Sequence, residues 1–290
     1  MQGSLSAGEM MRLMAEETRT SHGPVPRVLG GHQVAPGYDM FAGGEYLLRC
    51  DSGYGYHYRP GQGIMIERPG EGIDPDEEFL WLNGSVYAAV ACLNGLYPLH
   101  ASAVEFGGAV HAFTGPSGAG KSTLVSALGQ RGLTLFCDDT LLLHLPENGP
   151  MMALPGHKRL KLTAEALKLT GLAGEQPVGA GTGKSYVAPP AGAATKPLPL
   201  ASLIVLEDGP AVAWHEIAGA LRLLVLGDDH NVQRLYASAR RPTRAELFTR
   251  RSRIAATVAM ARLTRPMSAD SLAAAARLAL ARITQPGKRR

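Results

Sequence analysis

The segment from Gly115 to Ser122, which reads GPSGAGKS, matches the pattern G-x-x-x-x-G-K-[S/T] at every fixed position. An apolar run at residues 109–113 precedes it and a helical run at residues 121–131 follows it, which is the strand–loop–helix context that the pattern requires. The glycines let successive backbone N–H groups point at an anion, and the amino end of the helix adds its positive dipole. The segment therefore predicts a P-loop (Walker A) phosphate site in an α/β fold.

The P-loop pattern also indicates how the phosphates and a metal ion would be held. Lys121 would reach the β- and γ-phosphates of ATP, and the Ser122 hydroxyl would ligate Mg²⁺. The residues predicted to bind the nucleotide are Gly115, Pro116, Ser117, Gly118, Ala119, Gly120, Lys121, Ser122 and Thr123. A second Gly-Lys-Ser, residues 183–185, has Val178 where the first glycine belongs and follows no strand, so it is not another P-loop. Its Lys184 is either a solvated lysine or a cation that closes over the nucleotide.

Two adjacent aspartates, Asp138 and Asp139, follow Lys121 by only 17 and 18 positions. About ten residues of helix and one returning strand fill this gap, so the pair should emerge at the carboxyl end of a strand next to the P-loop. Neighbouring strand residues point to opposite sides, so the two carboxylates should do different jobs. One would hold Mg²⁺, for which we name Asp138 with Ser122, and one would accept a proton from an attacking hydroxyl. The sequence leaves this division open, and a pair that only caps the strand is the structural alternative.

The stretch LHASAVEFGGAVHAFTGPSGAGKSTLVSALGQRGLTLFCDDTLLL resembles the catalytic domain of the HPr kinase/phosphorylase family. In that family a histidine-containing strand, a P-loop, a helix and an Asp-Asp pair follow one another at this spacing. The resemblance implies catalytic roles for His100, Lys121, Asp138 and Asp139, and a fold similar to the nucleotide-binding part of phosphoenolpyruvate carboxykinase. It covers about residues 95–290, weakly after 165. The segments PGHKRLKL and RLTRPMSADSLAAAARLAL also look like HPr kinase-related proteins of peptide-modification clusters.

Several features depart from that family. Thr123 stands where HPr kinases usually have Glu, and the chain has no counterpart of the Glu-Val-Arg-Gly-like second signature, so neither phosphorolysis nor recognition of HPr is implied. Residues 25–73 alternate short apolar runs with Gly and Pro, which indicates antiparallel strands joined by turns. We therefore predict a β-rich N-terminal domain with a leading arm (1–95) and a P-loop kinase domain (96–290). The size and layout resemble relatives that phosphorylate a serine of a lasso-peptide precursor.

The remaining candidate residues each have a structural alternative. His157, Lys158, Arg159 and Lys161 form a basic cluster that would neutralise phosphate charge, bind an acidic peptide or simply be solvated. We select Lys158, Arg159 and Lys184 as contacts to phosphate or substrate. His100 either contacts the phosphate or is a satisfied buried histidine. The segment GHKRLKLTAEALKL, residues 156–169, is expected to hold a basic loop and then a helix. Residues 171–199, which are rich in Gly, Ala and Pro, are expected to form a mobile loop.

Composition bears on partners and compartment. Three cysteines without CxxC spacing favour a reducing cytoplasm over a disulfide framework or zinc site, and residues 1–20 do not resemble a signal peptide. The uncharged stretch 79–104 contains Asn, Gly, Pro and His, so it predicts buried helix, turn and strand instead of a membrane span. Residues 240–290 carry 13 of the 29 Lys and Arg but 2 of the 25 Asp and Glu. A solvated helix face explains that balance better than nucleic-acid binding.

Together these features predict a cytoplasmic Mg²⁺-ATP kinase that phosphorylates a serine hydroxyl of a peptide or small protein, with a lasso-peptide precursor as the leading substrate. A homo-oligomer is compatible with the sequence. HPr(Ser) kinase proper is one alternative. A small-molecule kinase of the shikimate kinase type is another, although those enzymes begin near the P-loop and carry Asp-x-Asp. A non-catalytic ATP-binding switch and a basic-tailed nucleic-acid protein are the readings from other classes.

Overall fold

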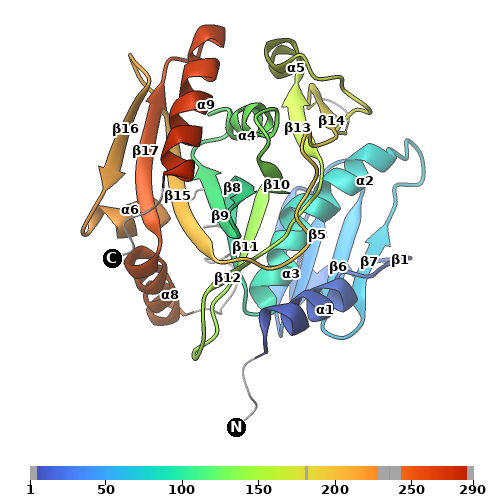
Figure 1. Ribbon diagram of the computed structural model, residues 1–290. Coiled ribbons are helices and arrows are strands. Elements are labelled where there is room, and N and C mark those ends of the chain that lie inside the picture. Colours follow the sequence, from blue (N-terminus) through green and yellow to red (C-terminus); the bar gives the residue numbers. More distant parts are fainter. Residues whose placement is uncertain (1–4, 180–181, 228–234, 236–242, 286–290) are drawn as a thin grey trace.

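The computed structural model describes residues 5–179, 182–227, 235 and 243–285. It shows a mixed α/β fold with a five-stranded sheet and an eight-stranded sheet, and with helices between and around them (Figure 1). Two small two-stranded sheets, β2–β3 and β13–β14, complete the strands of the described residues. No helix among the described residues is long and apolar enough to cross a membrane.

The five-stranded sheet comes from the N-terminal part of the chain. Its order is β1-β7-β6-β5-β4, antiparallel except for the parallel pair β1–β7. The strands are β1 (Thr20–His22), β4 (Tyr38–Ala42), β5 (Glu45–Arg49), β6 (Gly55–Arg59) and β7 (Gly63–Glu67), with β2 (Val28–Leu29) and β3 (His32–Gln33) as a separate pair. The prediction of short strands between Gly- and Pro-rich turns is confirmed. Helix α1 (Ala7–Glu17), which precedes the sheet, begins with a capping box formed by Ser6 and Glu9.

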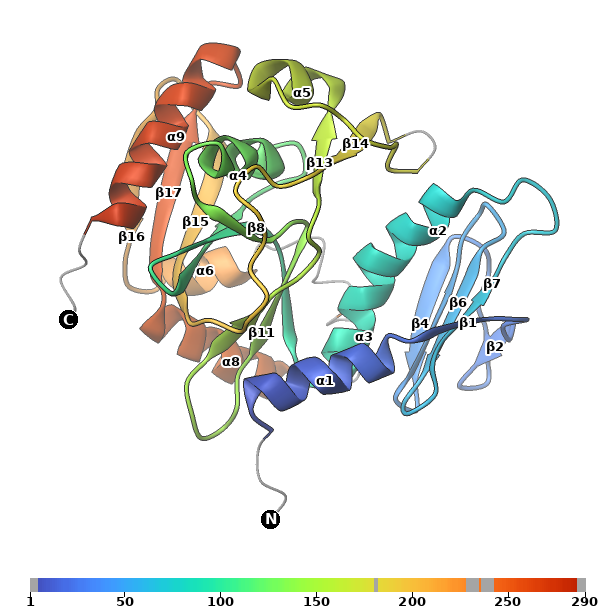
Figure 2. The same cartoon turned by 45° about the vertical axis from the view of Figure 1, so that its right-hand side comes forward.

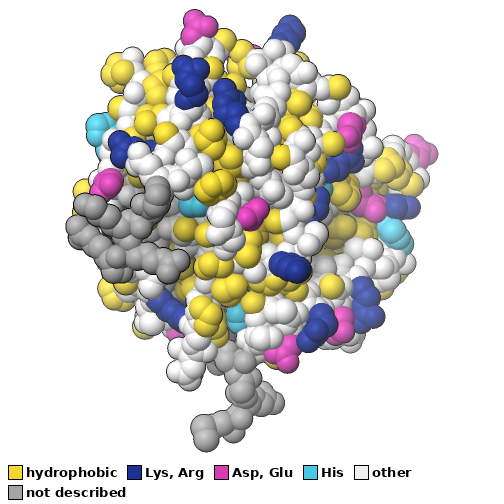
Figure 3. Space-filling model, in the orientation of Figure 1, with side chains coloured by type: hydrophobic (Ala, Val, Ile, Leu, Met, Phe, Trp, Pro, Cys, Tyr) yellow, Lys and Arg dark blue, Asp and Glu magenta, His cyan; other side chains and the backbone are white. Residues whose placement is uncertain are grey.

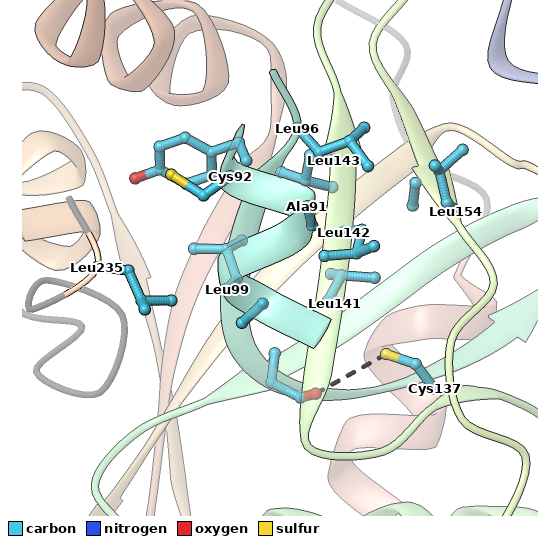
Figure 4. Packing of buried hydrophobic residues seen from close by; sticks show 14 of the residues in the cluster. Ala91, Cys92, Leu96, Leu99, Cys137, Leu141, Leu142, Leu143, Leu154 and Leu235 are labelled. Atoms are coloured by element: carbon cyan, nitrogen blue, oxygen red, sulfur yellow. Dashed lines mark hydrogen bonds between the residues drawn. The ribbon is translucent and has the colours of Figure 1, made fainter. Parts of the chain in front are cut away.

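A helical segment connects the two sheets. Helix α2 (Pro75–Trp81) is capped by Asp74, continues through a π-helical turn, η1 (Leu82–Val86), and becomes α3 (Tyr87–Leu93). Figure 2 shows α3 between the first sheet and the strands β8 and β11, and it contacts both sheets. In Figure 4, Ala91 of α3 lies beside Leu142 of β11 in this packing.

The two parts of the molecule share this packing. The predicted domain boundary after residue 95 falls between α3 and β8. One buried hydrophobic cluster nevertheless contains Tyr46 and Tyr56 of the first sheet together with Leu99 and Leu142 of the second. Apolar burial therefore stabilises the packing of both sheets against helix α3.

The eight-stranded sheet is mixed. Its order is β12-β11-β8-β9-β15-β17-β16, and β10 pairs with β8. The strands are β8 (Tyr97–Phe106), β9 (Ala109–Thr114), β10 (Thr134–Cys137), β11 (Thr140–His144), β12 (Met152–Leu154), β15 (Leu200–Asp208), β16 (Ala213–Ile217) and β17 (Ala259–Arg265). β9, β15 and β17 run parallel, and the other pairs are antiparallel. The carboxyl ends of β9, β15 and β17 therefore lie on one edge of the sheet.

Helices cover both faces of this sheet (Figure 1). Helix α4 (Lys121–Gly129) and helix α9 (Ala269–Thr284) pack together, and their buried residues share a cluster with Phe113 and Ile204. Helix α6 (Leu221–Gly227) and helix α8 (Arg244–Thr257) belong to the other cluster, with Leu203 and Met260. The P-loop helix α4 is thus buried among α9, α5 (Ala164–Thr170) and the strands of the sheet.

Two predicted loops contain strands instead. Residues Leu160–Thr163 form β13, which pairs antiparallel with β14 (Lys184–Val187). The predicted basic loop is therefore wrong from residue 160, and the predicted mobile loop 171–199 is wrong at 184–187. Leu160 and Leu162 are both buried to 1% exposure. An apolar residue at every second position is the pattern of a strand, which explains the difference. Helix α5 (Ala164–Thr170) follows with Thr163 as N-cap, as the helical pattern predicts.

Buried His111 of β9 makes the fold sensitive to acid. Its Nδ1 lies 2.8 Å from Ser202 Oγ, and burial lowers its pKa from 6.5 to about 4. The stability that its neutral form contributes is present above pH 6.5, the unfolded pKa, and is lost as the pH falls towards 4. We expect His111 to account for about 3 kcal/mol of lost unfolding free energy between pH 7 and 4. Urea unfolding of His111→Gln against the exposed control His32→Gln measures this, and equal acid losses in both variants would contradict it.

Candidate functional site

The P-loop follows β9 and leads into α4, as the sequence predicts. Gly120 is the N-cap of α4 and has φ +86°, a left-handed conformation that glycine adopts without a Cβ penalty. Lys121 is buried to 7% exposure, and its Nζ donates to the carbonyl oxygens of Gly115 (2.9 Å) and Pro116 (3.1 Å). The lysine therefore folds back over its own loop, beside the backbone groups that would surround a phosphate.

Asp138 is the buried member of the aspartate pair, with 1% exposure. Its Oδ1 accepts hydrogen bonds from Ser122 Oγ (2.8 Å) and Ser102 Oγ (2.6 Å), and its Oδ2 accepts one from the backbone N–H of Lys161 (2.8 Å). This carboxylate thus joins the P-loop helix, β8 and β13. Three hydrogen bonds to one buried carboxylate fix its position.

Asp139 has different surroundings. It has φ +75° and is the one residue other than glycine with positive φ in the described part of the chain. Its Oδ2 lies 2.8 Å from Lys161 Nζ, and its Oδ1 lies 3.4 Å from His100 Nδ1. The side chain is 31% exposed. The two aspartates lie in the link between β10 and β11, and not within a strand. The left-handed backbone conformation of Asp139 therefore gives the two carboxylates different surroundings, and strand alternation does not.

The position of β10 differs from the prediction. The strand that precedes the aspartates pairs with β8, and it does not lie next to β9, whose neighbours are β8 and β15. The aspartates reach the P-loop because β8 is the single strand between β10 and β9. Sequence spacing gives the length of the connection, while the order of strands depends on long-range pairing.

Charges around Asp139 determine its ionisation. Burial raises the pKa of Asp139, but Lys161 and His100 outweigh it, so the net pKa lies below the usual value. Burial lowers the pKa of Lys161, but the two aspartates outweigh it and the net pKa is raised. Asp139 is therefore a carboxylate and Lys161 an ammonium ion at neutral pH.

One cavity of about 210 Å³ gathers most of the predicted residues. Its lining includes His100, Ser117, Gly118, Gly120, Lys121, Ser122, Thr123, Asp139 and Lys184. It also includes Lys161, a member of the predicted basic cluster, and Ser102 and Arg265, for which no role was predicted. Asp138 lines a neighbouring cavity of about 190 Å³ with Asn83, Thr140 and His157. Gly115, Pro116 and Ala119 belong to the loop without lining the larger cavity.

Two predicted phosphate contacts lie elsewhere. Lys158 Nζ donates to the carbonyl oxygen of Ala194, and burial lowers its pKa. Arg159 pairs with Glu175, and its guanidinium carbon lies 4.9 Å from the ring centroid of Tyr186. Neither side chain lines the cavity of Lys121. The member of the basic cluster that does so is Lys161, and strand alternation with Leu160 and Leu162 was the signal that could have identified it.

The basic residues near the C-terminus have partners within the chain. Arg251 Nε donates to Tyr97 Oη (3.3 Å), Arg253 donates to the carbonyl oxygens of Pro146 and Gly149, and Arg262 pairs with Glu207 (2.8 Å). On the face in Figure 3, Lys and Arg side chains are scattered among acidic and apolar ones. Residues 240–242 and 286–290 of this basic segment lie outside the described residues.

The donor groups next to the P-loop suit Mg²⁺. Ser122 Oγ and Asp138 Oδ1 lie 2.8 Å apart and provide a hydroxyl and a carboxylate oxygen. No group of three or more His, Cys, Asp or Glu side chains suited to a metal occurs in the described ranges. Mg²⁺ needs no such group, because it is commonly held by one or two carboxylates, water and substrate phosphates. Ser122 and Asp138 are therefore the residues that would hold it.

No family model and no curated protein matches the chain. A structure of the Hpr(Ser) kinase/phosphatase from Coxiella burnetii matches with a TM-score of 0.34 and 15% identity, over 66% of this chain and 99% of that chain. A likeness of this degree does not assign a function to this chain.

Proposed function

We propose that the protein is an ATP-dependent kinase that transfers the γ-phosphoryl group to a serine hydroxyl of a peptide or small protein. The observation that carries this proposal is the arrangement of the two aspartates around a complete P-loop. Asp138 is hydrogen-bonded to the P-loop serine, Ser122, while Asp139 lines the same cavity as Lys121. Phosphoryl transfer needs these two kinds of carboxylate close to the γ-phosphate.

The P-loop would bind the phosphates. Lys121 would exchange its contacts with the carbonyl oxygens of Gly115 and Pro116 for phosphate oxygens, and the amino end of α4 would add backbone N–H groups. When bound at Ser122 and Asp138, Mg²⁺ would neutralise negative charge on the phosphates. Lys161 and Lys184 line the cavity as further cations. Electrostatic stabilisation of this kind supplies much of the catalysis in phosphoryl transfer.

Asp139 would be the base. The serine hydroxyl oxygen forms a bond to the γ-phosphorus, the bond from that phosphorus to the β–γ bridging oxygen breaks, and ADP leaves. The hydroxyl proton passes to Asp139, which its low pKa keeps ionised before the reaction. His100, 3.4 Å from Asp139, orients the carboxylate.

Features of the sequence favour a peptide as the acceptor. The resemblance of residues 95–290 to the HPr kinase family and of shorter segments to peptide-modification proteins favours a peptide serine, with a lasso-peptide precursor as the leading candidate. A second candidate is an ATP-binding switch without transfer. The ion pair between Asp139 and Lys161 favours it, because a base must be released from such a pair before it accepts a proton.

A screen for the acceptor tests the proposal. The protein is incubated with Mg²⁺-ATP and separately with peptides encoded beside its gene, with HPr and with small hydroxyl metabolites, and products are analysed by mass spectrometry. We expect one added phosphoryl group on a peptide serine. Transfer to HPr or to a metabolite would reject the peptide acceptor, and ATP binding without transfer to any of them would favour the switch.

A further inference from the structure

Arg265 reaches the P-loop from the opposite side of β9 to the aspartates. It is the last residue of β17, which pairs in parallel with β15, and β15 pairs in parallel with β9. Asp139 approaches from the other direction, through His100 on β8. Figure 1 shows α9, which follows β17, beside α4 on the same face of the sheet. The P-loop is therefore flanked by the aspartates on one side and by an arginine on the other.

The Arg265 guanidinium is buried without a full set of partners. The residue is 6% exposed, and its Nε has no hydrogen-bond partner. Its Nη1 makes only long contacts, 3.3 Å to Ser271 Oγ and 3.4 Å to the Pro266 carbonyl oxygen. Within the described residues no carboxylate forms an ion pair with it. Burial lowers its pKa accordingly. A buried cation with unused donors is costly unless an anion joins it.

The guanidinium lies directly on the P-loop. A Cβ atom added to Gly120 would collide with Nη2 of Arg265, so the arginine occupies the space that this glycine leaves open. Gly120 immediately precedes Lys121, and all three residues line the same cavity. The glycine thus allows a second cation to approach the loop beside Lys121.

The amino end of α9 lies at the same place. Met267 and Ser268 line the cavity, and Ser268 is the N-cap of this 16-residue helix but makes no side-chain cap hydrogen bond. The first N–H groups of a helix have no partners within the helix and carry its positive dipole end. An anion at this position would meet both the unused donors of Arg265 and the amino end of α9.

We propose that Arg265 and the amino end of α9 form a second anion subsite, which binds the β-phosphate of a nucleotide held by the P-loop. The inference rests on the proposed function in that the anion belongs to a nucleoside di- or triphosphate. The β-phosphate is favoured because the reacting γ-phosphate lies towards Asp139 and His100, on the other side of β9. ADP and ATP both contain this group, whereas AMP lacks it.

Calorimetric titration of the full-length protein tests the subsite. The ligands are ADP, a non-hydrolysable ATP analogue, AMP and pyrophosphate. Arg265→Gln should weaken ADP and the ATP analogue equally, by about 10- to 100-fold, and leave AMP unchanged, because a hydrogen-bonded charge is lost at the β-phosphate. Arg265→Lys should recover part of the loss, since it keeps a point charge without the fork of donors. The matched control is Arg262→Gln on the same strand, whose side chain is 44% exposed and pairs with Glu207.

The outcomes separate this inference from the proposed function. Unchanged ADP affinity in a folded Arg265→Gln would overturn the subsite, as would a loss confined to the ATP analogue. Loss of cooperative unfolding in both Arg265 variants would assign the residue a purely structural role and overturn it as well. Pyrophosphate binding that depends on Arg265, in a protein that binds no nucleotide, would support the anion subsite while rejecting the kinase. Absence of both kinds of binding would overturn both.

Discussion

Asp139→Asn is expected to lower the rate of phosphoryl transfer by about 10²- to 10⁴-fold and to leave nucleotide affinity nearly unchanged, because it removes a proton acceptor and no phosphate ligand. The asparagine has the same size, so it fills the same space in the link between β10 and β11, although it loses the ion pair with Lys161. Single-turnover transfer to the acceptor peptide, measured beside calorimetric titration of ADP, separates the two effects. A variant that transfers phosphate at the wild-type rate would exclude Asp139 as the base.

The pH profile of a second variant supplies the control. Lys161 is the strongest influence that lowers the pKa of Asp139, and it opposes the effect of burial. In Lys161→Met the pKa of Asp139 should therefore rise, so that the acidic limb of the rate profile moves to higher pH. The sign follows because Asp139 accepts a proton only when it is ionised. An acidic limb that stays in place, or moves to lower pH, would show that another group is the base.

Asp138→Asn is expected to lower the free energy of unfolding by about 2–4 kcal/mol, because buried donors would lose a charged acceptor. Asp138 accepts from Ser102 Oγ, Ser122 Oγ and the Lys161 backbone N–H, and an amide has only one oxygen to serve them. The same change should abolish the difference in ATP affinity with and without Mg²⁺, since it removes the carboxylate beside Ser122.

Urea unfolding and titration of ATP with and without Mg²⁺ measure these two effects. The matched control is Asp51→Asn, which changes an exposed aspartate of the N-terminal part and should shift the unfolding midpoint little. Equal midpoints for Asp138→Asn and Asp51→Asn would contradict the buried network. Retained Mg²⁺ dependence in Asp138→Asn would assign metal binding to other residues.

Local patterns predicted the elements that surround the site. Strand β9, the glycine-rich loop and helix α4 follow from apolar runs and glycine spacing over adjacent residues, and the structure has them where the sequence places them. Phosphate binding by this loop stays a prediction. The expectation of different surroundings for Asp138 and Asp139 also agrees with the structure. The predicted reason, alternation along a strand, was wrong, because both aspartates follow the end of β10 at Cys137 and Asp139 has a left-handed φ of +75°.

Residues whose contacts cross the sheet could not be assigned in the same way. Lys158, Arg159 and Lys161 are close in sequence, yet only Lys161 reaches Asp139, because β13 turns its side chain inward. Arg265 lies in an arginine-rich segment, and no sequence pattern around it distinguishes it from Arg262. One is buried against Gly120 and the other is partly exposed beside Glu207.

The sequence by itself determined a P-loop between a strand and a helix, a carboxylate pair shortly after it and a strand-rich N-terminal part. These features depend on the conformational preferences of neighbouring residues, so short segments of the sequence are enough to predict them. Only the tertiary structure decided that Asp138 binds Ser122, that Lys161 binds Asp139 and that Arg265 lies on Gly120. These contacts depend on the strand order β11-β8-β9-β15-β17, and long-range pairing, not local preference, sets that order.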